Sequence, residues 1–133
     1  MLTLGGIILI GIGLYFIFLR PALLPEDLHF VGRSFSNIQE NLPELLKWLS
    51  YVFLVMGGYI FSAGFLTCYL ALTGFRSKQH GAALVALVVG LSSIGLMVVV
   101  NFLIGSDFKW VLFLCFVPWI IALLLYKIES NEY

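Results

Sequence analysis

The residues that could carry chemistry gather in one polar segment and around one short loop. The seven candidates are Arg20, Glu26, Asp27, His29, Arg33, Asn101 and Asp107. If the polar segment folds over the mouth of a helical bundle, its carboxylates and imidazole could do acid–base work or bind a polar head group. The alternative is a solvated interfacial helix, because acidic residues at a helix start are already explained by the helix dipole. We therefore predict a polar surface site and no catalytic residue.

The histidines and cysteines do not form a metal or redox site. His29 lies in the polar segment and His80 in a loop expected on the other membrane face, so they cannot share a metal or a haem. Cys68 and Cys115 should be roughly 15–20 Å apart along the membrane normal, whereas a disulfide needs Cα atoms within about 7 Å. We expect no cofactor, no metal, and two cysteines that serve as small apolar residues.

The composition places these residues in a membrane protein. Of the 133 residues, 62% are hydrophobic and 11% are charged, whereas soluble domains have about 25% charged residues. A chain this short cannot hide so much apolar surface in a core. The formal net charge is zero, which gives no electrostatic case for nucleic acid.

Four charge-free stretches each approach or reach the roughly 17–25 residues that cross a bilayer. We predict an all-α fold, an integral membrane four-helix antiparallel bundle forming one domain over residues 1–133. The spans are expected at about 3–19, 49–74, 82–104 and 109–126. The first should be a retained span, since it lacks a basic leading region and a small-residue cleavage site.

The interfacial segment 20–48 joins the first two spans. Pro25, followed by Glu26 and Asp27, indicates a helix start, and a second start follows at Asn41-Leu42-Pro43-Glu44. We expect one or two short amphipathic helices on the membrane surface. An ordinary solvated loop is the alternative.

Small residues recur on three of the predicted spans and favour close helix packing. The positions expected at helix contacts are Gly6, Gly13, Gly58, Ser62, Ala82, Ala86 and Gly90. Together with the absence of charge inside the spans, they indicate a non-catalytic membrane subunit or accessory protein. Its expected partners are membrane lipids and other membrane protein subunits or a second copy of the chain.

A different class of function stays open. Pro118, Asn101 and the polar segment could frame a bilayer-accessible cavity that binds or carries a lipid-like or quinone-like molecule. A membrane enzyme using Glu26, Asp27 and His29 is a third hypothesis.

The basic residues nearly balance across the membrane. The terminal side holds Arg76, Lys78 and Lys127, and the other side holds Arg20, Arg33, Lys47 and Lys109. The count alone does not decide the orientation. The denser basic loop on the terminal side favours cytoplasmic termini.

The pattern also has a family resemblance. The glycine-rich first helix leads into Pro25-Glu26-Asp27-Leu28 and Gly32, and Gly57-Gly58-Tyr59 and Arg76 follow. Over nearly the whole chain this resembles the small uncharacterised bacterial membrane proteins of the DoxX-like group. The resemblance implies a four-helix bundle in a bacterial inner membrane and no established reaction. Better-known members of the group are described as quinol-oxidase-associated or redox-linked subunits.

Overall fold

The computed structural model describes residues 1–130, and these residues form helices with no strand among them. The elements are α1 (Leu2–Phe18), α2 (Pro25–Val31), α3 (Phe35–Asn41), α4 (Pro43–Leu70), η1 (Ala71–Phe75), α5 (Ala82–Gly90), η2 (Leu91–Gly95), α6 (Leu96–Leu103) and α7 (Lys109–Ser130). The η elements are π-helical turns that extend α4 and join α5 to α6. The all-α class predicted from the sequence is confirmed.

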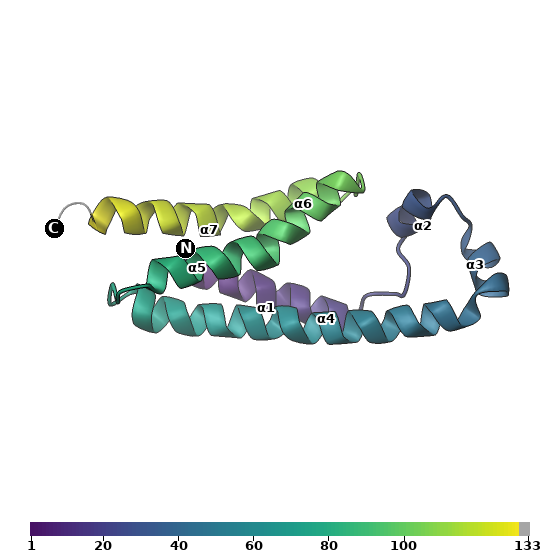
Figure 1. The fold of residues 1–133 in the computed structure, drawn as a ribbon, viewed down its shortest axis with the longest axis horizontal. Helices are drawn as coiled ribbons and strands as arrows, with labels where there is room; N and C mark the ends of the chain where they lie inside the picture. The colour runs from purple at the N-terminus through teal and green to yellow at the C-terminus, as the bar shows by residue number, and fades with distance from the viewer. Residues whose placement is uncertain (131–133) are drawn as a thin grey trace.

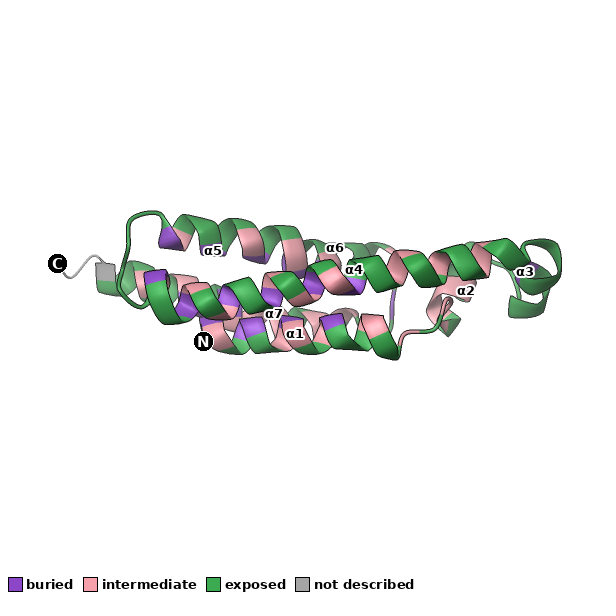
Figure 2. Ribbon diagram, turned by 90° about the horizontal axis from the view of Figure 1, so that it is seen from below, coloured by how far each residue is buried: buried purple, intermediate pink, exposed green. Residues whose placement is uncertain are grey.

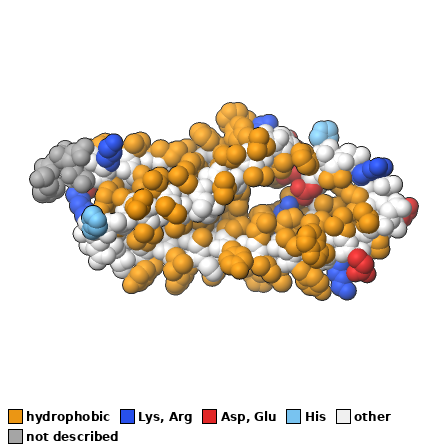
Figure 3. Space-filling model, in the orientation of Figure 1, with side chains coloured by type: hydrophobic (Ala, Val, Ile, Leu, Met, Phe, Trp, Pro, Cys, Tyr) orange, Lys and Arg blue, Asp and Glu red, His pale blue; other side chains and the backbone are white. Residues whose placement is uncertain are grey.

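Three helical rods are long and apolar enough to cross a membrane. They cover Pro43–Phe75 with 33 residues, Ala82–Leu103 with 22 and Lys109–Glu129 with 21. Their outward faces expose large hydrophobic side chains along the whole molecule, as Figure 3 shows for one face. An apolar surface of this extent fits lipid rather than water. The protein is therefore an integral membrane protein.

The rods lie side by side, and the two short helices sit at one end (Figure 1). Helix α1 is apolar with 17 residues and runs antiparallel to α4. The rod formed by α5, η2 and α6 slants from α4 toward α7. Helices α2 and α3 are separated by Gly32, whose φ of 68° lies in the left-handed region. The segment expected at the interface thus forms two short helices.

Glycines bring the backbones of α1 and α4 into direct contact. A Cβ built on Gly13 would lie 2.5 Å from the backbone nitrogen of Phe61, and one on Gly64 would lie 2.6 Å from that of Ile10. Gly6 and Gly57 are similarly confined. On each helix the two glycines are seven residues apart, which is about two helical turns and keeps them on one face. Figure 2 shows the resulting narrow stripes of buried residues.

Two of the expected packing positions lie outside the contact between α1 and α4. A Cβ built on Gly58 would meet no atom of another described helix within 4 Å, and Ser62 is exposed. The glycine beside it, Gly57, makes the contact with α1 instead. One residue turns a helix by about 100°, so Gly58 and Ser62 point away from the face that Gly57 and Gly64 share.

A buried tryptophan joins α1, α5 and α7. Trp119 is 1% exposed, and its indole nitrogen donates a 2.8 Å hydrogen bond to the Ala86 carbonyl. A Cβ on Gly5 would lie 2.7 Å from the Trp119 ring, and one on Gly90 would lie 2.6 Å from its Cδ1. Of the packing positions predicted on α5, Ala82, Ala86 and Gly90 are all buried. The indole therefore fills the space over Gly5 and Gly90, beside Ala86.

The two adjacent glycines of α4 allow a matched test of this packing. Gly57→Ala should destabilise the protein by about 1–3 kcal/mol, because its methyl group would overpack the contact with α1. Gly58→Ala should instead stabilise it by roughly 0.5–1 kcal/mol, since alanine is the better helix former. Unfolding equilibria in detergent would measure both. Equal effects of the two substitutions would contradict the packing described.

Candidate functional site

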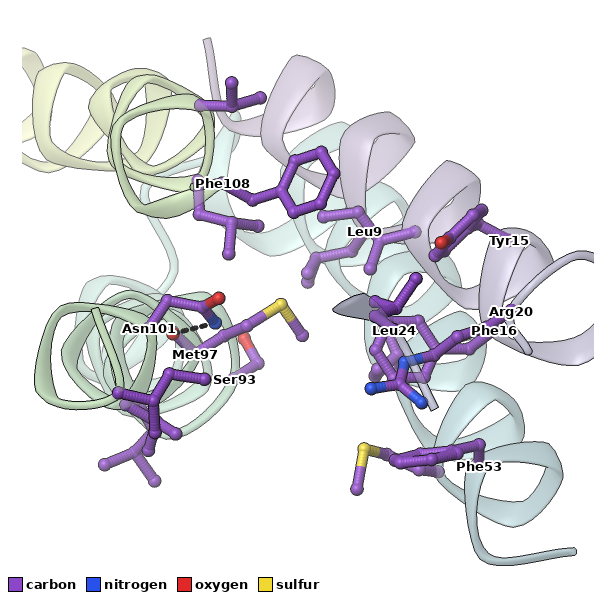
Figure 4. Close-up of a pocket in the computed structure, with 18 of the residues that line it drawn as sticks. Leu9, Tyr15, Phe16, Arg20, Leu24, Phe53, Ser93, Met97, Asn101 and Phe108 are labelled. Atoms are coloured by element: carbon purple, nitrogen blue, oxygen red, sulfur yellow. Dashed lines mark hydrogen bonds between the residues drawn. The ribbon is translucent and has the colours of Figure 1, made fainter. Parts of the chain in front are cut away.

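A cavity of about 690 Å³ lies between α1, α4, α6 and the start of α7 (Figure 4). This volume is within the roughly 300–1,000 Å³ typical of ligand pockets. Most of its wall is apolar. Representative members of that wall are Leu9, Ile12, Met56, Ile60, Met97 and Leu112. Pro118, which was expected to help frame a cavity, does not line it.

The cavity exists because the rod formed by α5, η2 and α6 diverges from α4. At one end α5 packs against α4 and η1. Farther along, α6 lies away from α4 and close to α7, as the slant of the rod in Figure 1 shows. Leu96 and Val100 of α6 line the cavity, and both side chains are exposed. The cavity therefore opens sideways between α4 and α6, where Figure 3 shows a hollow.

Arg20 forms the basic part of the polar end of the cavity, which we define as Arg20, Glu26 and Asp27. Its Nη2 lies 3.2 Å from Asp27 Oδ2, and its Nη1 donates to the Pro21 carbonyl at 3.2 Å. The guanidinium carbon lies 3.4 Å from the centre of the Phe53 ring, a cation–π contact. The side chain is 8% exposed. Burial lowers the pKa of the Arg20 guanidinium and Asp27 opposes this, but arginine stays protonated in proteins.

Helix α2 supplies the two carboxylates, and each carboxylate accepts a hydrogen bond from a different part of the chain. Asp27 Oδ2 accepts a 2.8 Å hydrogen bond from the Leu24 backbone nitrogen, which caps the helix start beside Pro25. Glu26 Oε1 accepts a 3.1 Å hydrogen bond from Ser106 Oγ, in the loop between α6 and α7. Ser106 is fully buried. These contacts hold α2 across the end of the cavity.

The structure brings together four of the seven residues predicted for the polar site. Arg20, Glu26, Asp27 and Asn101 line the same cavity. The Asn101 amide nitrogen donates a 2.8 Å hydrogen bond to the Met97 carbonyl, and its side chain lies on the wall opposite Arg20 (Figure 4).

The other three predicted residues lie elsewhere. His29, Arg33 and Asp107 are exposed and do not line the cavity. Within residues 1–130, no three His, Cys, Asp or Glu side chains are grouped so that they could hold a metal ion. The side chains that line the cavity and can contribute charge or hydrogen bonds include Arg20, Glu26 and Asn101.

Sequence reasoning missed several members of this site. Phe16 lies four residues before Arg20, a helical spacing that could have drawn attention to it. Phe53 and Ser106 carry no such signal, because they are 33 and 80 residues distant from Arg20 and Glu26, respectively, along the chain. Only folding places them beside those charges.

No family model, curated protein or solved structure matches this chain. The class of protein is therefore defined by its own features. It is an all-helical integral membrane protein with a laterally open cavity that is charged at one end.

Removing the Asp27 carboxylate should loosen the attachment of α2 to the end of the cavity. We expect Asp27→Ala to lower the free energy of unfolding by about 3 kcal/mol, because it leaves the Arg20 charge buried without its partner. Amide hydrogen exchange across residues 25–31 should also become faster. Glu40→Ala, at an exposed carboxylate of α3, should change stability by no more than about 0.5 kcal/mol. Unchanged exchange in the Asp27 variant would show that the ion pair does not hold α2.

Proposed function

We propose that this protein binds or carries an amphiphilic, lipid-like or quinone-like molecule in the cavity. The observation that carries the proposal is the distribution of polarity along the wall, with apolar side chains over most of it and Arg20, Glu26 and Asp27 at one end. Such a gradient matches a molecule with a hydrocarbon tail and a polar head. Apolar pockets with a few polar groups are typical of ligand sites.

The polar end is the part that would discriminate among ligands. A hydrocarbon tail gains little hydrophobic free energy on entering the cavity, because the bilayer it leaves is equally apolar. Hydrogen bonds and charge pairs at the head group must therefore provide the preference. Both carboxylates already accept hydrogen bonds within the protein, which supports binding rather than catalysis.

We further propose that α1 makes a fourth membrane crossing. Its 17 residues extend roughly 26 Å at about 1.5 Å per residue, close to the roughly 30 Å hydrocarbon core. The close contact between α1 and α4, which runs from Gly6 to Gly13 of α1, supports this arrangement. Exposed Trp48 and Trp110 lie toward the α2 end, where aromatic residues would mark the interface.

For the side of the membrane on which the termini lie, and for the type of membrane, the proposal rests on the sequence. The basic loop before α5 favours termini in the cytoplasm, and the resemblance to the DoxX-like group implies a bacterial inner membrane. Both stay predictions.

Two adjacent valines of α6 give a matched test of the cavity. Val99 is 53% exposed and Val100 is 49% exposed, but only Val100 lines the cavity. Val100→Trp should weaken the binding of an amphiphile that co-purifies with the protein about tenfold, which corresponds to about 1.4 kcal/mol. Val99→Trp should leave binding unchanged. Native mass spectrometry would measure the bound fraction, and equal retention by the two variants would count against the cavity as the site.

A second candidate function is a non-catalytic subunit that packs against a partner or a second copy. Gly58 and Ser62 favour it, because they form a four-residue small-residue pair on a face of α4 that no other described helix covers. This contact would lie on the outside of the molecule and is compatible with a ligand in the cavity.

The mass of the protein in mild detergent tests this second candidate. We expect a dimer or a co-purifying membrane protein, and Ser62→Leu should disrupt the association. Ser50→Leu, at another exposed serine of the same helix, should not. A strictly monomeric wild-type particle by light scattering would exclude self-association.

A further inference from the structure

The charges at the polar end of the cavity do not balance. Among the described residues that line the cavity, the charged ones are Arg20, Glu26 and Asp27, one cation and two carboxylates. Their formal sum is one negative charge. Charges interact strongly in a site with apolar walls, because such surroundings screen them less than water does. The sign of this sum therefore bears on which head group fits.

The positive charge already has its partner. Arg20 pairs with Asp27 at 3.2 Å and lies over the Phe53 ring. The two hydrogen bonds to Pro21 and Asp27 use two of the five N–H donors of the guanidinium, so it can still donate to a ligand oxygen. It does not, however, offer an uncompensated positive charge to an anion.

Glu26 is the carboxylate that forms no salt bridge with a described residue, although it lies close enough to Arg20 to interact with its charge at longer range. Its Oε1 accepts from the neutral hydroxyl of Ser106 at 3.1 Å. Asp27, by contrast, shares its Oδ2 between Arg20 and the Leu24 backbone. A head group that reaches the polar end thus meets one carboxylate in a salt bridge and one that forms no salt bridge with a described residue.

We propose that the cavity selects amphiphiles whose head group carries an ammonium group, and that Glu26 is the residue that selects them. This inference rests on the proposed function and names the chemistry of its ligand. An ammonium group has three N–H donors and can form with Glu26 the salt bridge that the described residues do not provide. A phosphate in the same head group can accept from the free donors of Arg20. A head group with net negative charge would add repulsion to a site that is already negative.

The test compares three lipids with identical acyl chains on the full-length protein. Native mass spectrometry from detergent micelles would measure binding of phosphatidylethanolamine, phosphatidylglycerol and uncharged diacylglycerol. We expect phosphatidylethanolamine to bind about tenfold more tightly than either of the others. Glu26→Gln should remove most of this preference, because the amide oxygen still accepts from Ser106 but the charge is gone. Glu40→Gln, at an exposed carboxylate outside the cavity, should keep it.

Each outcome is informative. Equal binding of phosphatidylethanolamine and phosphatidylglycerol by the wild-type protein would overturn the head-group inference and leave the cavity as a binding site. Equal binding of diacylglycerol would overturn the requirement for ammonium. If Glu26→Gln still prefers phosphatidylethanolamine, the proposed role of Glu26 is wrong. Asp27→Asn, which removes the other carboxylate charge, is the variant to compare with it. Failure of the wild-type protein to retain any of the three would overturn the proposed function for lipid-like ligands.

Discussion

The contact of Trp119 of α7 with α1 and α5 is the constraint on which the rest of the structure depends. Lipid tails are as apolar as the side chains they touch, so helices in a membrane associate through close packing and hydrogen bonds. The indole supplies both, because it fills the space over Gly5 and Gly90 and donates to the Ala86 carbonyl. It fixes one end of the slanting rod beside α1 and α7. At the other end α6 leans toward α7 and away from α4, and the cavity occupies the space between.

The polar end shows how the short segment between α1 and α2 is ordered. A buried charge is costly unless it is paired and hydrogen-bonded. Arg20 meets that requirement through Asp27, the Pro21 carbonyl and an aromatic face. Because Asp27 also caps α2, the pairing of the arginine and the start of the helix stabilise each other. The bond from Ser106 to Glu26 then connects α2 to the far side of the bundle.

The sequence allowed the helical class and the membrane setting to be predicted, since the exclusion of charge over roughly 20-residue stretches is a local property. The start of α2 at Pro25 was likewise readable from local signals. The packing face of α4 was not, because Gly57 and Gly58 differ only in which one the neighbouring helix meets. A bilayer-accessible cavity near Asn101 and the polar segment was among the hypotheses from the sequence, but its position was not predictable, since it arises from the divergence of α6 from α4 and Pro118 does not line it. Only part of the site was predictable. The charged residues Arg20, Glu26 and Asp27 were identified, but their partners Phe53 and Ser106 were not.

The sideways opening between α4 and α6 determines which concentration of ligand sets the occupancy of the cavity. A molecule that enters there never passes through water, and its competitors are the surrounding lipids. Occupancy by mass action then follows the mole fraction of the amphiphile in the bilayer rather than its aqueous concentration. A component that makes up a large share of the membrane would fill the cavity even with weak intrinsic preference. A rare one would need a strong preference over the bulk lipids, and the cavity would then report how abundant that component is in the membrane.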